Sequence, residues 1–155
     1  DGGLKKWKLE NRLLSNEKVD LVKANYKASI KNNLVINLDQ VENNIKKKEF
    51  CLIDARGENR FKGLVEEPRK NLKKGSVKGS KNLPFTKIIN SENNTFKKKE
   101  ELEKIFLNHD IDLKEKLAFS CGSGITACVL GLAGAIINNK LPVIYDGSWA
   151  EYGLK

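Results

Sequence analysis

Three short apolar runs, each followed at once by an aspartate or a cysteine, constrain the fold of this 155-residue chain most strongly. The runs cover residues 50–53, 117–120 and 143–145, and they are followed by Asp54, Cys121 and Asp146. Runs of this length are typical of buried strands, and the longer segments between them are typical of helices. The sequence therefore predicts an α/β fold, with a central and mostly parallel sheet that carries helices on both faces.

Two amphipathic segments and one apolar segment predict the helices. The positions that share a helical face are Leu38, Val41 and Ile45 in the first segment, and Leu102, Ile105 and Phe106 in the second. Asn37 and Gln40 have the spacing of a capping box before the first helix. The apolar segment, residues 127–137, predicts a buried helix. A long loop is expected over residues 55–81, followed by a short strand at residues 82–84.

The carboxyl ends of the predicted strands indicate where a site would lie. In open parallel sheets, ligands bind outside these ends of the strands. Asp54, Cys121 and Asp146 stand there, and the loop of residues 55–81 leaves the same edge. We expect both aspartates to end their strands by accepting backbone N–H groups, rather than to act as bases.

Cys121 is the main candidate for chemistry. It follows a strand and opens the run Cys-Gly-Ser-Gly-Ile-Thr. Gly122 and Gly124 allow the backbone to curl so that several N–H groups point inward, and the following helix adds its positive end. Both effects stabilise a thiolate or a persulfide. The alternative is a buried cysteine beside a plain glycine turn.

The side chains that follow Cys121 have two interpretations each. Ser123 is expected either to hydrogen-bond the sulfur or the substrate, or to serve as a small turn residue. Thr126 is expected to be the N-cap of the following helix, or a hydroxyl that lines the cavity.

The remaining cysteines and the histidine are interpreted as structural residues. Cys51 and Cys128 are predicted to be small buried apolar residues, in a strand and in the apolar helix. The odd number of cysteines lacks the spacing of a disulfide framework or a zinc site, so no metal is predicted. His109, the only histidine, is predicted to lie solvated at a helix end. A reduced, intracellular compartment fits this cysteine usage.

Arginine is rare in this chain, and most of it lies in one segment. The 29 basic residues include only four arginines, which are Arg12, Arg56, Arg60 and Arg69. Arg60 and Arg69, on the loop above the strand ends, have the fork geometry that clamps a small carboxylate. The alternative is surface salt bridging to Glu58, Glu66 and Glu67. Arg56 is predicted to tie the loop to the sheet.

Composition narrows the range of partners. The formal net charge is +9, but the lysines are spread along the chain without interleaved aromatic residues. This distribution favours a solvated, Lys-rich surface over nucleic-acid binding. No apolar run is long enough to cross a bilayer, so a membrane is not expected as a partner either.

The two ends of the chain resemble each other. Asp1-Gly2-Gly3 opens it, with Trp7 four residues further on, and Asp146-Gly147-Ser148-Trp149 stands near its end. If two copies of one domain followed each other, each would finish with such a turn. Residues 1–15 would then be the tail or linker of a preceding domain, and residues 19–155 the domain that bears Cys121.

In combination, several segments resemble the rhodanese family, and its 3-mercaptopyruvate sulfurtransferase branch in particular. The matching segments are residues 52–56, 60–63, 67–69, 79–85, 121–128 and 145–153. The resemblance implies a rhodanese-like α/β fold and two tandem domains, of which only the second carries the cysteine. The stretch of residues 75–80 departs from the family's usual Gly-His-Ile-Pro-Gly-Ser.

The resemblance also implies site residues. The sulfur-carrying cysteine falls on Cys121, and the two arginines that bind the substrate carboxylate fall on Arg60 and Arg69. Ser123 resembles one member of a Ser-His-Asp relay whose other members lie in the missing N-terminal domain. The loop residues that would contact the substrate are Gly122, Gly124, Ile125 and Thr126. This loop is uncharged, whereas the thiosulfate-using branch typically has a basic loop suited to a dianion.

The implied activity is transfer of sulfur from 3-mercaptopyruvate to a thiol or cyanide through a Cys121 persulfide, with no metal or organic cofactor. The implied partners are the small sulfur donor, a thiol acceptor such as thioredoxin, and the N-terminal rhodanese-like domain of the same protein. The expected location is the cytoplasm, or the mitochondrion in a eukaryote. Thiosulfate sulfurtransferase and a non-catalytic rhodanese-like binding module remain as alternatives. A Cys-loop phosphatase is disfavoured, because Ala127 stands where its arginine would be.

Overall fold

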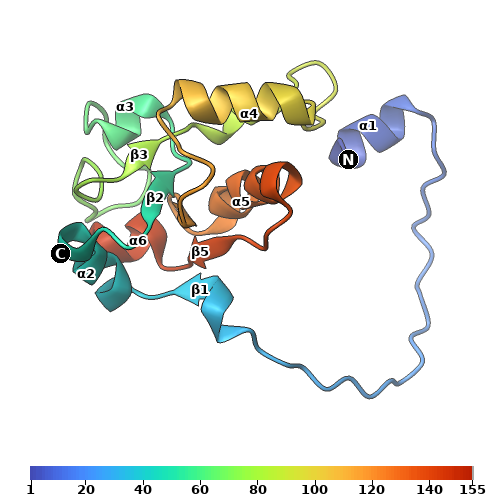
Figure 1. The fold of residues 1–155 in the computed structure, drawn as a ribbon. Helices are drawn as coiled ribbons and strands as arrows, with labels where there is room; N and C mark the ends of the chain where they lie inside the picture. Colours follow the sequence, from blue (N-terminus) through green and yellow to red (C-terminus); the bar gives the residue numbers. More distant parts are fainter. Residues whose placement is uncertain (155) are drawn as a thin grey trace.

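A computed structural model describes residues 1–154 and contains one sheet of five parallel strands (Figure 1). The strands are β1 (Val35–Ile36), β2 (Cys51–Asp54), β3 (Lys81–Asn82), β4 (Leu117–Ser120) and β5 (Val143–Tyr145). Their order across the sheet is β1-β5-β4-β2-β3. The predicted parallel sheet is therefore confirmed. The edge strand β1 adds to the predicted strands, since two apolar residues give too short a pattern to detect.

Helices connect the strands and include the three that the sequence predicts. They are α1 (Gly3–Leu9), α2 (Leu38–Lys47), α3 (Glu58–Phe61), α4 (Lys99–Asn108), α5 (Ile125–Asn138) and α6 (Ser148–Tyr152), with 3-10 turns at Asn32–Leu34 and Phe85–Ile88. The capping box of α2 is present. Asn37 Oδ1 accepts the Gln40 N–H at 3.0 Å, and Gln40 Oε1 accepts the Asn37 N–H at 2.9 Å.

Side chains that alternate along the strands divide the core into two layers. Ile53 and Phe119 pack with residues of α4 and α5 on one face of the sheet. Leu52 and Ala118 point to the other face, where they pack with residues of α2 and α6. Both faces of the sheet are thus covered by helices, as predicted.

The register of the strands aligns their carboxyl ends. Asp54 is paired with Ser120 on one side and with Asn82 on the other, so Cys121 leaves β4 beside the end of β2. Tyr145, the last residue of β5, precedes Asp146 at the same edge. Loops from three neighbouring strands therefore meet there, as expected for a ligand site in a parallel sheet.

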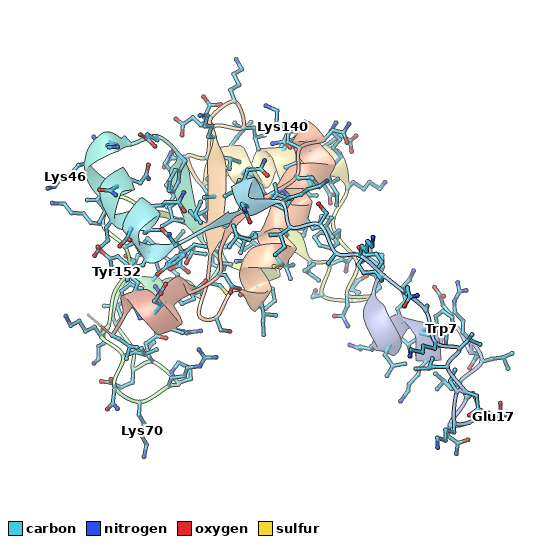
Figure 2. All side chains as sticks on the ribbon, turned by 90° about the horizontal axis from the view of Figure 1, so that it is seen from below. Trp7, Glu17, Lys46, Lys70, Lys140 and Tyr152 are labelled. Atoms are coloured by element: carbon cyan, nitrogen blue, oxygen red, sulfur yellow. The ribbon has the colours of Figure 1, made fainter. Side chains whose placement is uncertain are left out.

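The first residues of the chain form an arm beside this sheet. Residues 12–31 contain no helix or strand and are exposed, and Figure 2 shows Trp7 and Glu17 well away from the main body. Helix α1 follows Asp1 and Gly2, much as α6 follows Asp146 and Gly147, so the resemblance between the chain ends extends to local structure. The boundaries at residues 15 and 19 stay a prediction. Within residues 1–154, no helix has the length and apolar character needed to cross a membrane.

Candidate active site

Residues at the start of α6 form hydrogen bonds with the backbone of Cys121. The Cys121 N–H donates to Ser148 Oγ at 3.1 Å, and the Cys121 carbonyl accepts the Trp149 N–H at 2.9 Å. One residue further on, the Gly122 carbonyl accepts the Ala150 N–H at 2.9 Å. Three hydrogen bonds thus fix the backbone at the beginning of the loop, and leave its later N–H groups free to turn toward the sulfur.

Ser148 is a site residue that the sequence does not predict. Its side chain is fully buried, and its Oγ also donates to the Tyr145 carbonyl at 2.7 Å. Its φ of 50° lies in the left-handed region, which non-glycine residues seldom adopt. The available signal was its position, since a small hydroxyl residue after Gly147 at a strand end can bridge two loops.

The thiol of Cys121 lies in a ring of hydrogen-bond donors. The Ser123 N–H donates to Cys121 Sγ at 3.4 Å. Burial raises the pKa of Cys121, but the Thr126 hydroxyl and the backbone N–H groups of Ser123, Ala127 and Thr126 outweigh it, so this pKa is lowered from its ordinary value. Donors of this kind stabilise a thiolate, and would equally stabilise the terminal anion of a persulfide.

Two glycines of the loop allow close contacts with neighbouring segments. Gly124 is the N-cap of α5 with φ +82°, and a Cβ there would stand 3.0 Å from the Asp146 carbonyl oxygen. Gly122 has a different reason, because its missing Cβ would lie 3.1 Å from Nη2 of Arg60. The loop is therefore packed against the turn after β5 on one side and against an arginine on the other.

The residues at the start of α5 differ in their surroundings. Thr126 is not the N-cap, since Gly124 in the left-handed conformation takes that position and permits the tight turn. The alternative interpretation of Thr126, a hydroxyl that faces the cavity, agrees with its hydrogen bond to Cys121. Ile125 is 73% exposed, so its side chain is available to a molecule that approaches the loop.

Arg56 ties the long loop to the sheet, as predicted. Its guanidinium is buried and pairs with Asp54 at 2.7 Å and with Glu67 at 2.8 Å. It also donates to the Gly75 carbonyl at 2.8 Å and lies over the Trp149 ring, 4.3 Å from the ring centre. Paired in this way, the buried charge connects β2, the loop and α6.

Arg60 lies at the cysteine loop, whereas Arg69 does not. Nη2 of Arg60 pairs with Glu67 Oε2 at 2.5 Å, so the salt-bridging alternative holds for Arg60 while its guanidinium also borders Gly122. Arg69 is exposed, and among residues 1–154 it forms no hydrogen bond or ion pair. Its predicted role in binding a carboxylate stays a prediction. Glu67, which the sequence suggests only as a surface salt-bridge partner, is instead buried between two arginines.

The two strand-end aspartates behave differently. Asp54 accepts the Arg56 N–H at 2.9 Å, as expected of a residue that ends a strand. Asp146 is exposed, and it accepts no hydrogen bond from the described part of the chain, so the same expectation is wrong for it. The reason is the turn after β5, where Ser148 rather than Asp146 receives the neighbouring backbone N–H.

The other two cysteines differ in their exposure to solvent. Cys51 is buried in β2, and burial raises the pKa of its thiol, as expected of a structural residue. Cys128 is exposed, so the prediction that it is buried is wrong. The buried positions of α5 are Ala127, Leu130, Gly131, Ala133, Gly134 and Ile137. Cys128 lies about 100° around the helix from Ala127 and falls on the solvent face.

His109 closes α4, where the sequence places it. It is the C-cap of that helix, with Nδ1 2.8 Å from the Asn82 carbonyl and Nε2 3.2 Å from Nζ of Lys87. The side chain is half-buried rather than fully solvated.

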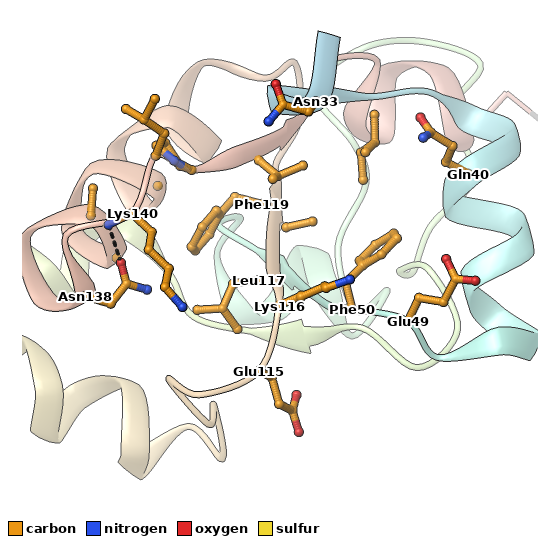
Figure 3. Close-up of a pocket in the computed structure, with 18 of the residues that line it drawn as sticks. Asn33, Gln40, Glu49, Phe50, Glu115, Lys116, Leu117, Phe119, Asn138 and Lys140 are labelled. Atoms are coloured by element: carbon orange, nitrogen blue, oxygen red, sulfur yellow. Dashed lines mark hydrogen bonds between the residues drawn. The ribbon is translucent and has the colours of Figure 1, made fainter. Parts of the chain in front are cut away.

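A cavity of about 460 Å³ lies at the opposite edge of the sheet, where β4 and β5 begin. Figure 3 shows the rings of Phe50 and Phe119 in it, with Lys116 and Lys140 around them. Its lining includes neither Cys121 nor Arg60. The candidate site is therefore the cysteine loop at the carboxyl edge and not this cavity.

The fold and the site define an α/β domain with a cysteine in a backbone N–H ring at the carboxyl edge of a parallel sheet. Residues 37–155 match the family described as the rhodanese-like domain, and the chain belongs to that family.

Two relatives of this chain are named as sulfurtransferases. The human 3-mercaptopyruvate sulfurtransferase is 32% identical over 155 residues, which are 100% of this chain and 52% of the human protein. Thiosulfate/3-mercaptopyruvate sulfurtransferase 2 of Arabidopsis thaliana is 42% identical over 127 residues, 82% of this chain and 37% of the plant protein.

A solved structure agrees with these relatives. The 3-mercaptopyruvate sulfotransferase SseA of Escherichia coli is 30% identical, with a TM-score of 0.80 over 95% of this chain and 54% of SseA. The chain thus spans about half the length of the human and bacterial relatives, and a second domain is consistent with that length.

Proposed function

We propose that this domain transfers sulfur from 3-mercaptopyruvate to a thiol or cyanide through a persulfide on Cys121. The observation that carries the proposal is the ring of donors around Cys121 Sγ, which lowers the pKa of this buried thiol. A buried cysteine with no chemical role has its pKa raised by burial, as Cys51 does. Arg60, at the edge of the same loop, supplies a cation for the substrate carboxylate.

In the first half-reaction, the Cys121 thiolate attacks the sulfur of 3-mercaptopyruvate. An S–S bond forms, the C–S bond breaks, and its electron pair leaves on the enolate of pyruvate, which takes up a proton. Arg60 and Arg69 bind the carboxylate, and Gly122, Gly124, Ile125 and Thr126 border the substrate. The Ser123 hydroxyl hydrogen-bonds the substrate, as a member of a relay completed by the N-terminal half of the protein.

In the second half-reaction, an acceptor thiolate or cyanide attacks the outer sulfur of the persulfide. A new bond to sulfur forms, the S–S bond breaks, and its electron pair returns to Cys121 as the thiolate. The acceptor is a small thiol or a thiol protein such as thioredoxin. The cycle needs a free Cys121 thiol, so a reduced compartment such as the cytoplasm or the mitochondrial matrix suits it.

Thiosulfate is the second candidate donor, because the Arabidopsis relative is named for both substrates. The loop of residues 122–126 contains no charged side chain. An uncharged loop offers little compensation for the second charge of thiosulfate, which favours the monocarboxylate donor.

The donor is tested by steady-state kinetics with cyanide as acceptor, in this chain and in a form extended at its N-terminus. A kcat/KM at least about tenfold higher for 3-mercaptopyruvate than for thiosulfate supports the proposal. A preference for thiosulfate would assign the other donor. Absence of thiocyanate from both donors, in folded protein of both lengths, would contradict sulfur transfer altogether.

A further inference from the structure

We infer that Glu67 is a positioning residue, which orients Arg60 and cancels part of its charge so that the cleft prefers a monocarboxylate over a dianion. This inference rests on the proposed function, because it concerns the same cleft. The Glu67 side chain is 2% exposed, and its carboxylate binds two arginines, with Oε1 accepting from both of them and Oε2 from Arg60. Oε1 pairs with Arg56 at 2.8 Å and Oε2 pairs with Arg60 at 2.5 Å.

The contacts of Glu67 leave one edge of the Arg60 guanidinium free. Nε and Nη2 of Arg60 both face Glu67, at 3.3 and 2.5 Å. Nη1 has no partner among the residues that the structure describes. Nη2 also borders Gly122, so the guanidinium is held against the cysteine loop. A carboxylate that binds the free Nη1–Nη2 edge would therefore bind end-on, beside the loop.

The charges around this edge balance. Asp54, Arg56, Glu67 and Arg60 form a chain of alternating charges that sums to zero. The neighbouring loop of residues 122–126 adds no charge. The other cations of this segment are Arg69 and several lysines, and none of those described forms an ion pair with these four residues. Within this chain of charges a second negative charge on the ligand would meet no cation beyond Arg60, and Glu67 would repel it.

A purely structural role for Glu67 makes a different prediction. If Glu67 only holds the loop in place, any replacement weakens the binding of all anions by the same factor. If its charge sets the preference, Glu67→Gln, which keeps the shape and removes the charge, favours dianions selectively. Glu67→Asp keeps the charge on a shorter side chain. It should therefore weaken the binding of both kinds of anion while preserving the ratio of their dissociation constants.

The test measures binding of pyruvate, a monocarboxylate, by titration calorimetry, with sulfate as a competing dianion so that only shared sites count. Wild-type protein should bind pyruvate more tightly than sulfate. Glu67→Gln should shift the ratio of dissociation constants toward sulfate by about tenfold, and Glu67→Asp by less than about twofold. Glu66→Gln is the matched control, because Glu66 is an exposed neighbour that pairs, among residues 1–154, with Lys74 alone, and the ratio of dissociation constants should not change in this variant.

An unchanged ratio in Glu67→Gln, or sulfate binding more tightly than pyruvate in wild type, would overturn the inference. If Glu67→Gln does not fold, Glu67→Asp still tests the inference, because a changed ratio of dissociation constants in that variant would contradict it. Binding requires no sulfur transfer, so the expected ratios without persulfide formation would support this inference while contradicting the proposed function. The KM for 3-mercaptopyruvate should rise more than kcat falls in Glu67→Asp, since the misplaced guanidinium affects binding first.

Discussion

The cysteine loop (residues 121–126) and the arginine loop (residues 55–81) meet at one edge of the sheet but are held differently. The backbone of Cys121 and Gly122 is fixed by three hydrogen bonds to α6. The arginine loop has backbone anchors at Lys73, but the part that carries Arg60 is held through side-chain charges, from Arg56 and Arg60 to Glu67, and Arg69 is exposed. Thiol reactivity should therefore depend on backbone geometry, whereas donor binding should depend on charges that can be removed one at a time.

The largest expected effect is on stability, from Arg56→Leu. This change leaves the buried carboxylates of Asp54 and Glu67 without their shared cation, which should lower the free energy of unfolding by about 3–5 kcal/mol. Arg69→Leu, at an exposed position, should change it by less than about 0.5 kcal/mol. Urea unfolding followed by circular dichroism measures both. Equal losses in the two variants would show that the loop is not anchored by Arg56.

Next in size is the effect of Arg60→Ala on donor use. Loss of a charge-assisted bond to the carboxylate should cost about 2–3 kcal/mol, which is about 30- to 150-fold in kcat/KM for 3-mercaptopyruvate. Arg69→Ala should raise KM by about tenfold without changing stability. Pyruvate release measures both. If Arg69→Ala has no effect on KM, the carboxylate is bound by Arg60 alone.

Ser148→Ala tests the backbone anchor of the cysteine loop. The buried Cys121 N–H loses its acceptor, so the free energy of unfolding should fall by about 1–3 kcal/mol. The rate of persulfide formation should fall as well, because the N–H groups of the loop can move away from Cys121 Sγ. The matched control is Ser91→Ala at an exposed loop position. A variant with wild-type stability and rate would contradict the role given to Ser148.

The smallest effect is expected from Thr126→Val, which removes a donor to Cys121 Sγ without changing volume. Sulfur transfer follows the thiolate fraction, which rises with pH through the pKa of Cys121. Because hydrogen bonds lower that pKa, the wild-type rate should reach half its maximum below the pKa of an ordinary thiol. In Thr126→Val the midpoint should move to higher pH, and the rate at neutral pH should fall about 3- to 10-fold. Thr126→Ser should keep the wild-type profile, whereas equal midpoints in all three proteins would exclude this hydrogen bond.

Much of the fold follows from local patterns in the sequence. The apolar runs predict β2, β4 and β5, and the capping box predicts the start of α2, because burial on both faces and capping leave clear local signals. The ring of donors around Cys121 follows from its glycines and the helix after them. These features each depend on residues that lie close together in the chain.

The features that the sequence does not predict depend on contacts between distant residues. Ser148 meets Cys121 only because β4 and β5 are adjacent in the sheet. Glu67 is buried because the loop folds back onto Arg56, whereas Glu66 beside it is exposed, and local patterning does not predict this difference in burial. The exposure of Cys128 depends on a helical phase that an almost wholly apolar segment conceals.

The most direct test of sulfur transfer is the intact mass of the protein after incubation with 3-mercaptopyruvate, followed by peptide mapping. The account predicts a gain of one sulfur atom on Cys121 that disappears on addition of a thiol acceptor. Cys121→Ser should show no gain, and Cys128→Ser should behave as wild type. A sulfur retained in Cys121→Ser, or carried by exposed Cys128 instead, would contradict the assignment of Cys121 as the sulfur carrier.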